Sequence, residues 1–290
     1  MTQHWVQHSQ AVLAASVLVA RADTSAVRRR LERQGLSIWP AAEDAGSHPV
    51  IIELWRVERG QLALGGKALE DVWAAAGTAA WAAPALLFGS RERLKRAADS
   101  GARAGRAVAD ALIDRWGSYH ELLVSIPDVR APDLTEPCQL VLGMYTDSAL
   151  SKRGAEWLGY GYGKRLADFQ RCDFATFSTR VPDDGRSLRA RFAPSSGSSQ
   201  LLASVSELAQ LRAWLSQPLL GLHGGARALS RLTRDYATQI RPACGSLELD
   251  LELSAELLTG TQPLLGFQSG FHAPALPVQL SFPRAAARWT

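Results

Sequence analysis

Gly159-Tyr160-Gly161-Tyr162-Gly163-Lys164-Arg165 is the most unusual local sequence in the chain, with three glycines and two tyrosines leading to a lysine. A phosphate-binding loop needs a glycine five residues before its Gly-Lys pair and a Ser or Thr after it. Leu158 and Arg165 occupy those two places. A dinucleotide fingerprint also fails, because Lys164 stands at the third glycine position. Two interpretations remain: an ordinary exposed lysine in a flexible loop, or a lysine with a chemical role.

A strand upstream of this run carries an acid among apolar residues. The segment Pro49–Glu58 is rich in Val, Ile and Trp, and strand alternation places Ile51, Glu53 and Trp55 on one face. One interpretation is an edge strand with Glu53 in water, and the pattern of this strand alone favours it. The other is an acid that points into a barrel cavity, where desolvation would raise its pKa.

A second acid lies in the predicted strand Tyr119–Ile126, where Glu121 shares a face with Tyr119 and Leu123. Here too the simpler interpretation is a carboxylate in solvent at the start of a strand. The neighbouring His120 could be a base, but it faces the other side of the strand. We therefore predict a structural role for it.

Three segments, taken in chain order, resemble the acetoacetate decarboxylase superfamily. Residues 145–147 and 156–167 resemble the family segment that carries the Schiff-base lysine, which falls on Lys164, while Arg165 replaces a second lysine. Residues 50–57 and 118–127 resemble the segments with the two active-site glutamates, which fall on Glu53 and Glu121. The strands predicted from 246 to 282 resemble the C-terminal half of the family only loosely.

The chain also departs from this family. Gly163 replaces the usual proline, and the run before it has two extra residues. The family decarboxylase has an active-site arginine near its N-terminus, whereas this chain has none before Arg21 and offers only His8 or Gln10 there. This difference favours aldolase, dehydratase or cyclase chemistry over simple decarboxylation.

The resemblance implies a carbon-carbon or carbon-oxygen lyase that acts on a small oxo acid or ketone without a cofactor or metal. A free lysine has a pKa of ~10.4 and must lose its proton to react. The charge of Arg165 would favour that loss through its field, as a neighbouring cation does in acetoacetate decarboxylase itself. Lys164 would form an iminium, and Glu53 and Glu121 would shuttle protons, with acid and base unassigned. The alternative is a non-catalytic barrel protein that binds an apolar small molecule.

Composition limits the other possibilities. The 290 residues are 47% hydrophobic with a net charge of +4, and the arginines are spread along the chain, which argues against a nucleic-acid partner. The three cysteines form no Cys-x-x-Cys pair, which argues against a disulfide framework or a zinc site and for a cytoplasmic location. The N-terminus lacks the basic region of a signal peptide. The resemblance further implies a homo-oligomer.

We predict one α+β domain over residues 1–290, a β-rich, barrel-like fold with an inserted helical block at about 67–116. This block is expected to cover or lengthen the barrel mouth. It contains the uncharged stretch Val72–Ser90, which is nearly long enough to span a membrane. Because the stretch is mostly alanine and includes Gly77 and Pro84, we predict a buried helix or helix pair with no membrane partner.

Overall fold

The computed structural model describes most of the chain and confirms the α+β class. Its strands join in one 16-stranded sheet. The described residues are 7–40, 46–64, 67–88, 90–115, 119–132, 134–170, 176–180, 187–194, 209–223, 227–235, 241–250, 265–281 and 283–285.

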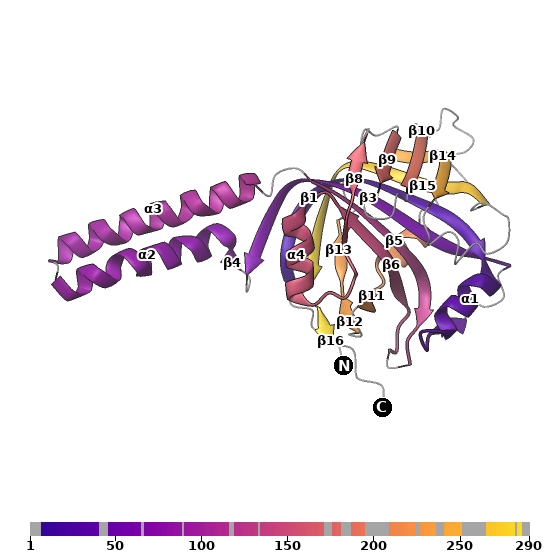
Figure 1. Ribbon diagram of the computed structural model, residues 1–290, viewed down its shortest axis with the longest axis horizontal. Helices are drawn as coiled ribbons and strands as arrows, with labels where there is room; N and C mark the ends of the chain where they lie inside the picture. The colour runs from indigo at the N-terminus through magenta and orange to yellow at the C-terminus, as the bar shows by residue number, and fades with distance from the viewer. Residues whose placement is uncertain are drawn as a thin grey trace.

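The elements follow one another along the chain as Figure 1 shows. The helices are α1 (Thr24–Glu32), α2 (Leu69–Phe88), α3 (Arg91–Arg115) and α4 (Ala149–Leu158), and residues 209–215 are also helical. The strands are β1 (Gln7–Asp23), β2 (Ser37–Ile38), β3 (Ser47–Leu64), β4 (Lys67–Ala68), β5 (Tyr119–Arg130), β6 (Cys138–Thr146), β7 (Arg165–Leu166), β8 (Asp168–Gln170), β9 (Thr176–Arg180), β10 (Ser187–Pro194), β11 (Leu219–Gly221), β12 (Ala228–Ser230), β13 (Leu232–Arg234), β14 (Arg241–Asp250), β15 (Leu265–Ser281) and β16 (Arg284–Ala285).

The sheet curls strongly, as the strand order shows. Its main path is β16-β12-β11-β6-β5-β3-β1-β15-β14-β10-β9-β8, and β13 pairs with β15 away from this path. Only Arg231 separates β12, near one end of the path, from β13, which lies against β15. The described strands form no pairing between β12 and β13, so the predicted barrel-like fold is here a curved, open sheet.

Each face of the central strands packs into its own core. On one face, Val50, Ile52 and Leu54 of β3 lie in a cluster with Val27 and Leu31 of α1. This helix begins at Thr24, because the Asp23 side chain accepts a hydrogen bond from the Ala26 amide at 2.9 Å. Burying a side chain such as Leu31 contributes about 1.5–3 kcal/mol. The outer core thus holds α1 on the sheet.

The opposite face of the same strands is the concave, inner one. Ile51 and Trp55 of β3 lie there in a second cluster with Tyr160, Tyr162 and Trp214. Because the side-chain period of a strand is two, Glu53 points to this inner face as well. The sheet therefore brings one acid of the predicted site into an aromatic interior.

Helices α2 and α3 occupy the segment that was predicted to be a helical block, and its status as an insertion stays a prediction. They lie side by side and extend away from the sheet, which differs from the expected cover over a barrel mouth (Figure 1). They pack closely because a Cβ at Gly77 or Gly101 would collide with the carbonyl group of the other glycine.

The prediction of a buried helix for Val72–Ser90 was only half correct. One side of α2 packs on α3, and Ala75 and Ala79 on the other side are exposed, because α3 covers a single side. Within the described part of the chain, none of the helices combines the length and hydropathy that crossing a bilayer requires. The cytoplasmic location stays a prediction.

Candidate active site

The glycine-tyrosine run begins where α4 ends. Gly159 closes the helix in the left-handed conformation (φ 74°), and the Tyr160 amide bonds back to the Ala155 carbonyl at 3.1 Å. Gly161 and Gly163 also have positive φ, at 65° and 60°. Proline is locked near −65°, so it could not occupy position 163 with this backbone. The glycine that replaces the family proline therefore belongs to a different local path of the chain.

This run is an ordered wall of the interior, which excludes the flexible-loop interpretation. Tyr160, Tyr162 and Lys164 are all buried, and the two tyrosine rings stack with centroids 5.3 Å apart. The Tyr160 hydroxyl donates to the Ser281 carbonyl at 2.9 Å, and the Tyr162 hydroxyl bonds the Ser230 hydroxyl. Side chains alternate between the two sides of this segment, so Lys164 is buried whereas Arg165 is exposed.

Lys164 forms a compact polar cluster with one acid and one hydroxyl. Its Nζ lies 2.6 Å from Glu121 Oε1 and 2.8 Å from Ser151 Oγ. The Ser151 hydroxyl in turn donates to the same carboxylate oxygen at 2.5 Å. Both charged side chains of the pair are only 6% exposed. Two of the predicted site residues are therefore in direct contact.

Ser151 is a member of this cluster that sequence reasoning missed. It lies in the first turn of α4, and its amide bonds the side chain of the N-cap Ser148 at 3.2 Å. A Ser cap directly after a strand was the available signal, because it fixes where the helix begins and so where its first turn lies.

Tyrosines surround the cluster and stay protonated at neutral pH. Burial raises the pKa of Tyr119, the charge of Glu121 raises it further, and a hydrogen bond with Ser151 opposes this. Burial likewise raises the pKa of Tyr162, against a hydrogen bond with Ser230, while Glu121 raises it and Arg234 lowers it. The opposite effects of Glu121 and Arg234 show that Tyr162 senses both charges.

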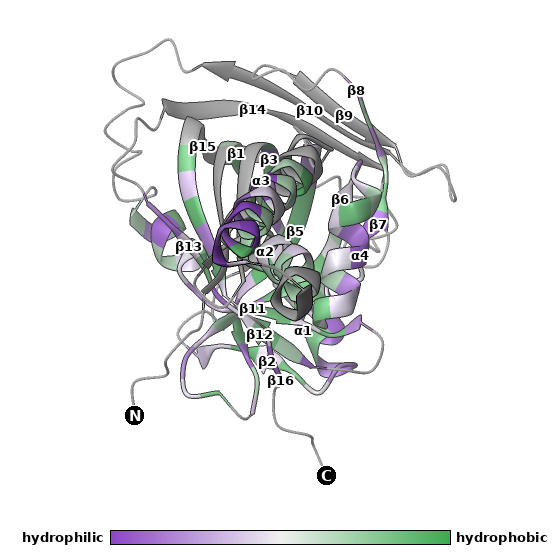
Figure 2. Cartoon of the chain, turned by 90° about the vertical axis from the view of Figure 1, so that its left-hand side faces the viewer, coloured by the Kyte–Doolittle hydropathy of each residue, from purple (hydrophilic) through white to green (hydrophobic). Residues whose placement is uncertain are grey.

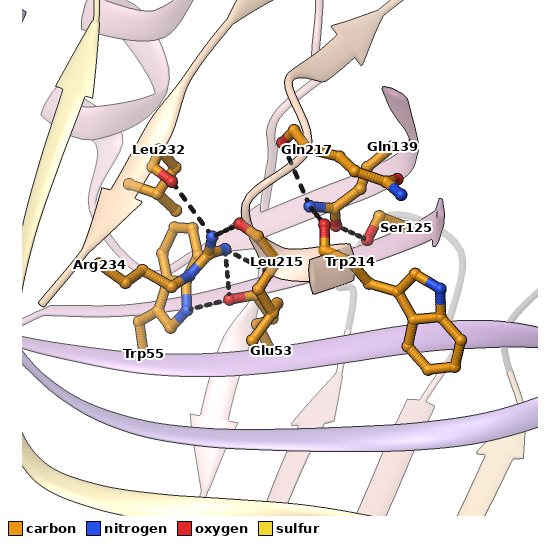
Figure 3. Close-up of polar contacts among 9 residues, drawn as sticks. All are labelled: Glu53, Trp55, Ser125, Gln139, Trp214, Leu215, Gln217, Leu232 and Arg234. Atoms are coloured by element: carbon orange, nitrogen blue, oxygen red, sulfur yellow. Dashed lines mark hydrogen bonds and ion pairs between the residues drawn. The ribbon is translucent and has the colours of Figure 1, made fainter. Parts of the chain in front are cut away.

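Glu53 is fully buried and binds an arginine instead of water. Both of its carboxylate oxygens accept hydrogen bonds from Arg234 Nη2, at 2.7 and 2.8 Å, and Trp55 Nε1 donates at 3.2 Å (Figure 3). Its strand, β3, lies between β1 and β5 in the middle of the sheet. The interpretation of an edge position in water is therefore wrong.

Arg234 has further partners that complete its coordination. Its Nη1 donates to the carbonyl of Leu215, and also to that of Leu232 at 3.3 Å (Figure 3). Leu215 is the last residue of the 209–215 helix, where carbonyl groups lack intrahelical partners and a positive charge is favourable. The guanidinium thus ties β3, β13 and this helix end together.

The two acids are neighbours on the inner face. Glu53 pairs with Leu123 and Trp55 pairs with Glu121 across β3 and β5, so the acids lie diagonally on one side of the sheet. Diagonal positions of this kind are about 7–8 Å apart at the backbone. Glu121 contacts Lys164, whereas Glu53 contacts Arg234, and a site shared by all three predicted residues stays a prediction.

An arginine beside these acids was not expected, because none precedes Arg21. The fold instead supplies Arg234, which lies 181 residues after Glu53 in the chain. The preference for aldolase, dehydratase or cyclase chemistry stays a prediction, because Arg234 is bound to Glu53 and to main-chain carbonyls. No local signal in Leu232-Thr233-Arg234 pointed to this role.

Arg165 and His120 lie outside the inner cluster. Arg165 is exposed on β7, whereas Lys164 is buried, and the effect of the Arg165 charge on Lys164 stays a prediction. His120 lies on the other face of β5, where its Nδ1 is 2.8 Å from Asp147 Oδ2 and its ring stacks on Phe169. Its predicted structural role agrees with these contacts.

Comparisons with known proteins identify the fold. No family model and no curated protein matches the chain. The enduracididine biosynthesis enzyme MppR with HEPES buffer bound has a similar structure, with a TM-score of 0.54 at 13% identity, over 98% of this chain and 90% of that one. MppR complexed with pyruvate gives the same TM-score and identity, over 98% of this chain and 92% of that one. Acetoacetate decarboxylase from Legionella pneumophila has a TM-score of 0.54 at 12% identity, over 97% of this chain and 88% of that one.

These solved structures belong to the superfamily that the sequence resembles. The chain therefore has the acetoacetate decarboxylase-like fold, as predicted. At identities this low, the likeness is one of fold, and the chemistry has to be argued from the site.

Proposed function

We propose that this protein is a Schiff-base-forming lyase that acts on a small oxo acid or ketone through Lys164. The observation that carries the proposal is the buried Lys164 amine, 2.6 Å from a carboxylate and 2.8 Å from a hydroxyl, on the inner face of the sheet. The fold is shared with enzymes, including one solved with pyruvate bound.

Glu121 is the residue best placed to handle the proton of the amine. In the first step the Lys164 ammonium gives a proton to Glu121, and the neutral nitrogen attacks the substrate carbonyl carbon. Glu121 returns that proton to the carbonyl oxygen, and the carbinolamine loses water to give the iminium. Direct hydrogen-bond contact between acid and amine is the geometry that such a transfer needs. The Ser151 and Tyr119 hydroxyls can donate hydrogen bonds to the oxygen that leaves.

The iminium is the electron sink that a lyase reaction needs. Its nitrogen accepts the electron pair of the bond that breaks, whether CO₂ leaves, an aldol bond opens or an adjacent proton is removed before water is lost. MppR has been solved with the condensation product of pyruvate and imidazole 4-carboxaldehyde. Pyruvate, alone and with an aldehyde, is therefore the first substrate to test.

The other predicted site residues receive different roles. Glu53 was predicted to share proton transfer, but its contacts with Arg234 and Trp55 favour a fixed negative charge at the wall of the site. Arg165, being exposed, would act on Lys164 only weakly, since water screens its field.

Borohydride trapping tests the proposal. The full chain is incubated with pyruvate and other oxo acids, reduced with sodium borohydride and analysed by mass spectrometry. We expect a mass gain equal to the oxo acid less one oxygen atom, on the peptide that contains Lys164. Lys164→Arg should give no adduct, and Lys152→Arg, which alters a partly exposed lysine on α4, should keep it.

Two outcomes would contradict this proposal. An adduct that persists in Lys164→Arg would move the chemistry to another amine. Binding of the ligands without any reducible adduct would favour the non-catalytic, small-molecule-binding protein.

A further inference from the structure

The buried cations on the inner face of the sheet already have anionic partners. Lys164 pairs with Glu121, and Arg234 pairs with Glu53. Among the residues that the structure describes, these are the lysine and the arginine that are buried, and each pair sums to zero charge. A substrate carboxylate that entered this site would therefore find both buried cations occupied.

Arg234 has little capacity left for a second carboxylate. Each terminal nitrogen of a guanidinium carries two N–H donors. Nη2 donates to both oxygens of Glu53, and Nη1 donates to the carbonyls of Leu215 and Leu232. A substrate carboxylate could bind these donors only by displacing their present partners. Displacing Glu53 would leave its charge buried without a partner, which is strongly unfavourable.

Glu121 disfavours a carboxylate beside the carbon that reacts. Its Oε1 lies 2.6 Å from Lys164 Nζ, the nitrogen to which the substrate carbonyl carbon becomes bonded. In the adduct of a 2-oxo acid, the carboxylate carbon is two bonds from that nitrogen, so the carboxylate would lie within roughly 5 Å of Glu121. Like charges this close repel strongly in a site shielded from water. The iminium carries one positive charge, which Glu121 already balances.

The other neighbours of this pair are aromatic or apolar. The rings of Tyr160 and Tyr162 stack with centroids 5.3 Å apart, and Trp55 belongs to the same buried cluster. Tyr119 packs against that cluster from β5, and the middle of this strand is hydrophobic in colour in Figure 2. Surfaces of this kind bind apolar and aromatic groups, because the contact removes both from water.

We propose that the substrate is an uncharged ketone or aldehyde with an apolar or aromatic substituent. This inference rests on the Schiff-base function proposed above and narrows its substrate class. It also narrows the reaction, because a substrate without a carboxylate has no CO₂ to lose. A β-hydroxy ketone is a form of this substrate that an iminium can cleave between its α- and β-carbons.

Cleavage of a β-hydroxy ketone balances without a further reactant. Its carbonyl forms the Lys164 iminium and releases water. Glu121 takes the proton of the β-hydroxyl, the bond between the α- and β-carbons breaks, and its electron pair passes to the iminium to give an enamine. The β-carbon leaves as an aldehyde. Glu121 returns the proton to the α-carbon, and water hydrolyses the iminium to release the shorter ketone and the Lys164 ammonium.

Borohydride trapping with matched compounds on the full chain tests the substrate class. Benzylacetone and benzylpyruvate differ only in whether a methyl group or a carboxylate flanks the carbonyl, and acetone and pyruvate are the same pair without the aromatic ring. Because an oxo acid carbonyl is the more reactive in itself, each adduct yield is divided by that of Nα-acetyllysine under the same conditions. We expect benzylacetone to exceed benzylpyruvate by about tenfold or more, and also to exceed acetone.

Glu121→Gln isolates the effect of the charge. Both adducts should form more slowly in this variant, but the preference for benzylacetone over benzylpyruvate should fall toward that of Nα-acetyllysine. Glu32→Gln is the matched control, because Glu32 is an exposed acid on α1 at the outer face, and it should keep the preference of the unmodified chain.

Product release tests the reaction. The β-hydroxy ketone formed from acetone and benzaldehyde should be cleaved by the unmodified chain, with benzaldehyde followed by its ultraviolet absorbance. Lys164→Arg should release none.

The outcomes separate this inference from the function on which it rests. Normalised yields that favour the oxo acids, an equal preference in Glu121→Gln and the unmodified chain, or equal yields from acetone and benzylacetone would overturn the substrate class and leave the Schiff-base function standing. Release of CO₂ from acetoacetate without cleavage of the β-hydroxy ketone would do the same. The absence of an adduct with all four compounds would overturn both proposals.

Discussion

Two buried ion pairs lie on the inner face of one sheet, and they differ in what their cations can do. Lys164 meets Glu121 through one nitrogen and shares a serine hydroxyl with it, whereas Arg234 contacts both oxygens of Glu53. A lysine can lose its proton when its surroundings favour it, but an arginine keeps its proton at any pH a protein tolerates. The first pair can therefore move a proton, and the second can only hold its position.

Their surroundings differ in the same sense. The Arg234 and Glu53 side chains are 1% and 0% exposed, and Trp55 and two main-chain carbonyls complete their hydrogen bonds. The Lys164 pair keeps 6% exposure on each side chain. Removing two charges from water is costly. A buried ion pair whose hydrogen bonds are all made within the protein is therefore best explained by a structural role, which is to join the elements that carry its residues. Lys164 is therefore the residue that can react, whereas Arg234 holds the elements around the site in position.

The largest expected effect is on the lysine itself. Lys164→Ala and Lys164→Arg should both lose turnover and the borohydride adduct, the second because guanidinium cannot lose its proton to attack a carbonyl. Because the Glu121 carboxylate would lose its ion-pair partner, a melting experiment should show a larger loss for Lys164→Ala than for Lys164→Ala/Glu121→Gln. If Lys164→Ala turned over substrate near the original rate, Lys164 would not be the reactive residue, and the contrast between the two ion pairs would not hold.

Glu121→Gln should have the next largest effect. An amide cannot accept the proton of Lys164, so we expect the rate of adduct formation to fall by about 10²–10⁴-fold, the usual contribution of a positioned acid or base. Stopped-flow trapping measures it, with urea unfolding to show that the fold remains. A rate for Glu121→Gln within a factor of about 2 of the original would assign proton transfer to another group.

Breaking the arginine pair should act on stability. Arg234→Met leaves the Glu53 carboxylate buried without its partner, which typically costs about 3–5 kcal/mol. Arg234→Met/Glu53→Leu should recover much of that loss, because it removes both charges. Urea unfolding of the single and double variants measures this. A stable Arg234→Met with an inactive site would mean that Arg234 acts in the chemistry and not in the structure.

The stability of the protein should depend on pH through Tyr162, whose pKa is affected by one member of each pair, Glu121 and Arg234. Burial raises its pKa above the ordinary 10.0. Its contribution to stability is therefore complete below pH 10.0 and is lost as the pH rises further, because the unfolded chain releases the proton first. Tyr162→Phe should flatten the decline of unfolding free energy between about pH 9 and 11. An unchanged slope would mean that this hydroxyl ionises in the folded protein as readily as in the unfolded chain.

Arg165 should show the smallest effect. Arg165→Lys should keep activity, and Arg165→Leu should lose only a small part of it, because the exposed charge acts on Lys164 through water. An alkaline shift in the rate profile of Arg165→Leu is the measurement. A loss of activity comparable to that of Glu121→Gln would place this residue inside the site.

Local pattern in the sequence determined which residues face together. The alternation of Pro49–Glu58 placed Glu53 and Trp55 on one side, the cap at Asp23 marked the start of α1, and the run around Lys164 marked the unusual lysine. Each of these depends on residues within a few positions of one another, because strand period and helix capping are local properties.

Tertiary structure alone decided what those residues touch. Whether Glu53 meets water or a partner depends on the place of β3 in the sheet, and its partner Arg234 comes from a strand that pairs on the far side of β15. Ser151 reaches Lys164 only because α4 folds back beside β6 and β7. Contacts between residues far apart in the chain depend on how whole elements pack, and no spacing within the sequence encodes that packing directly.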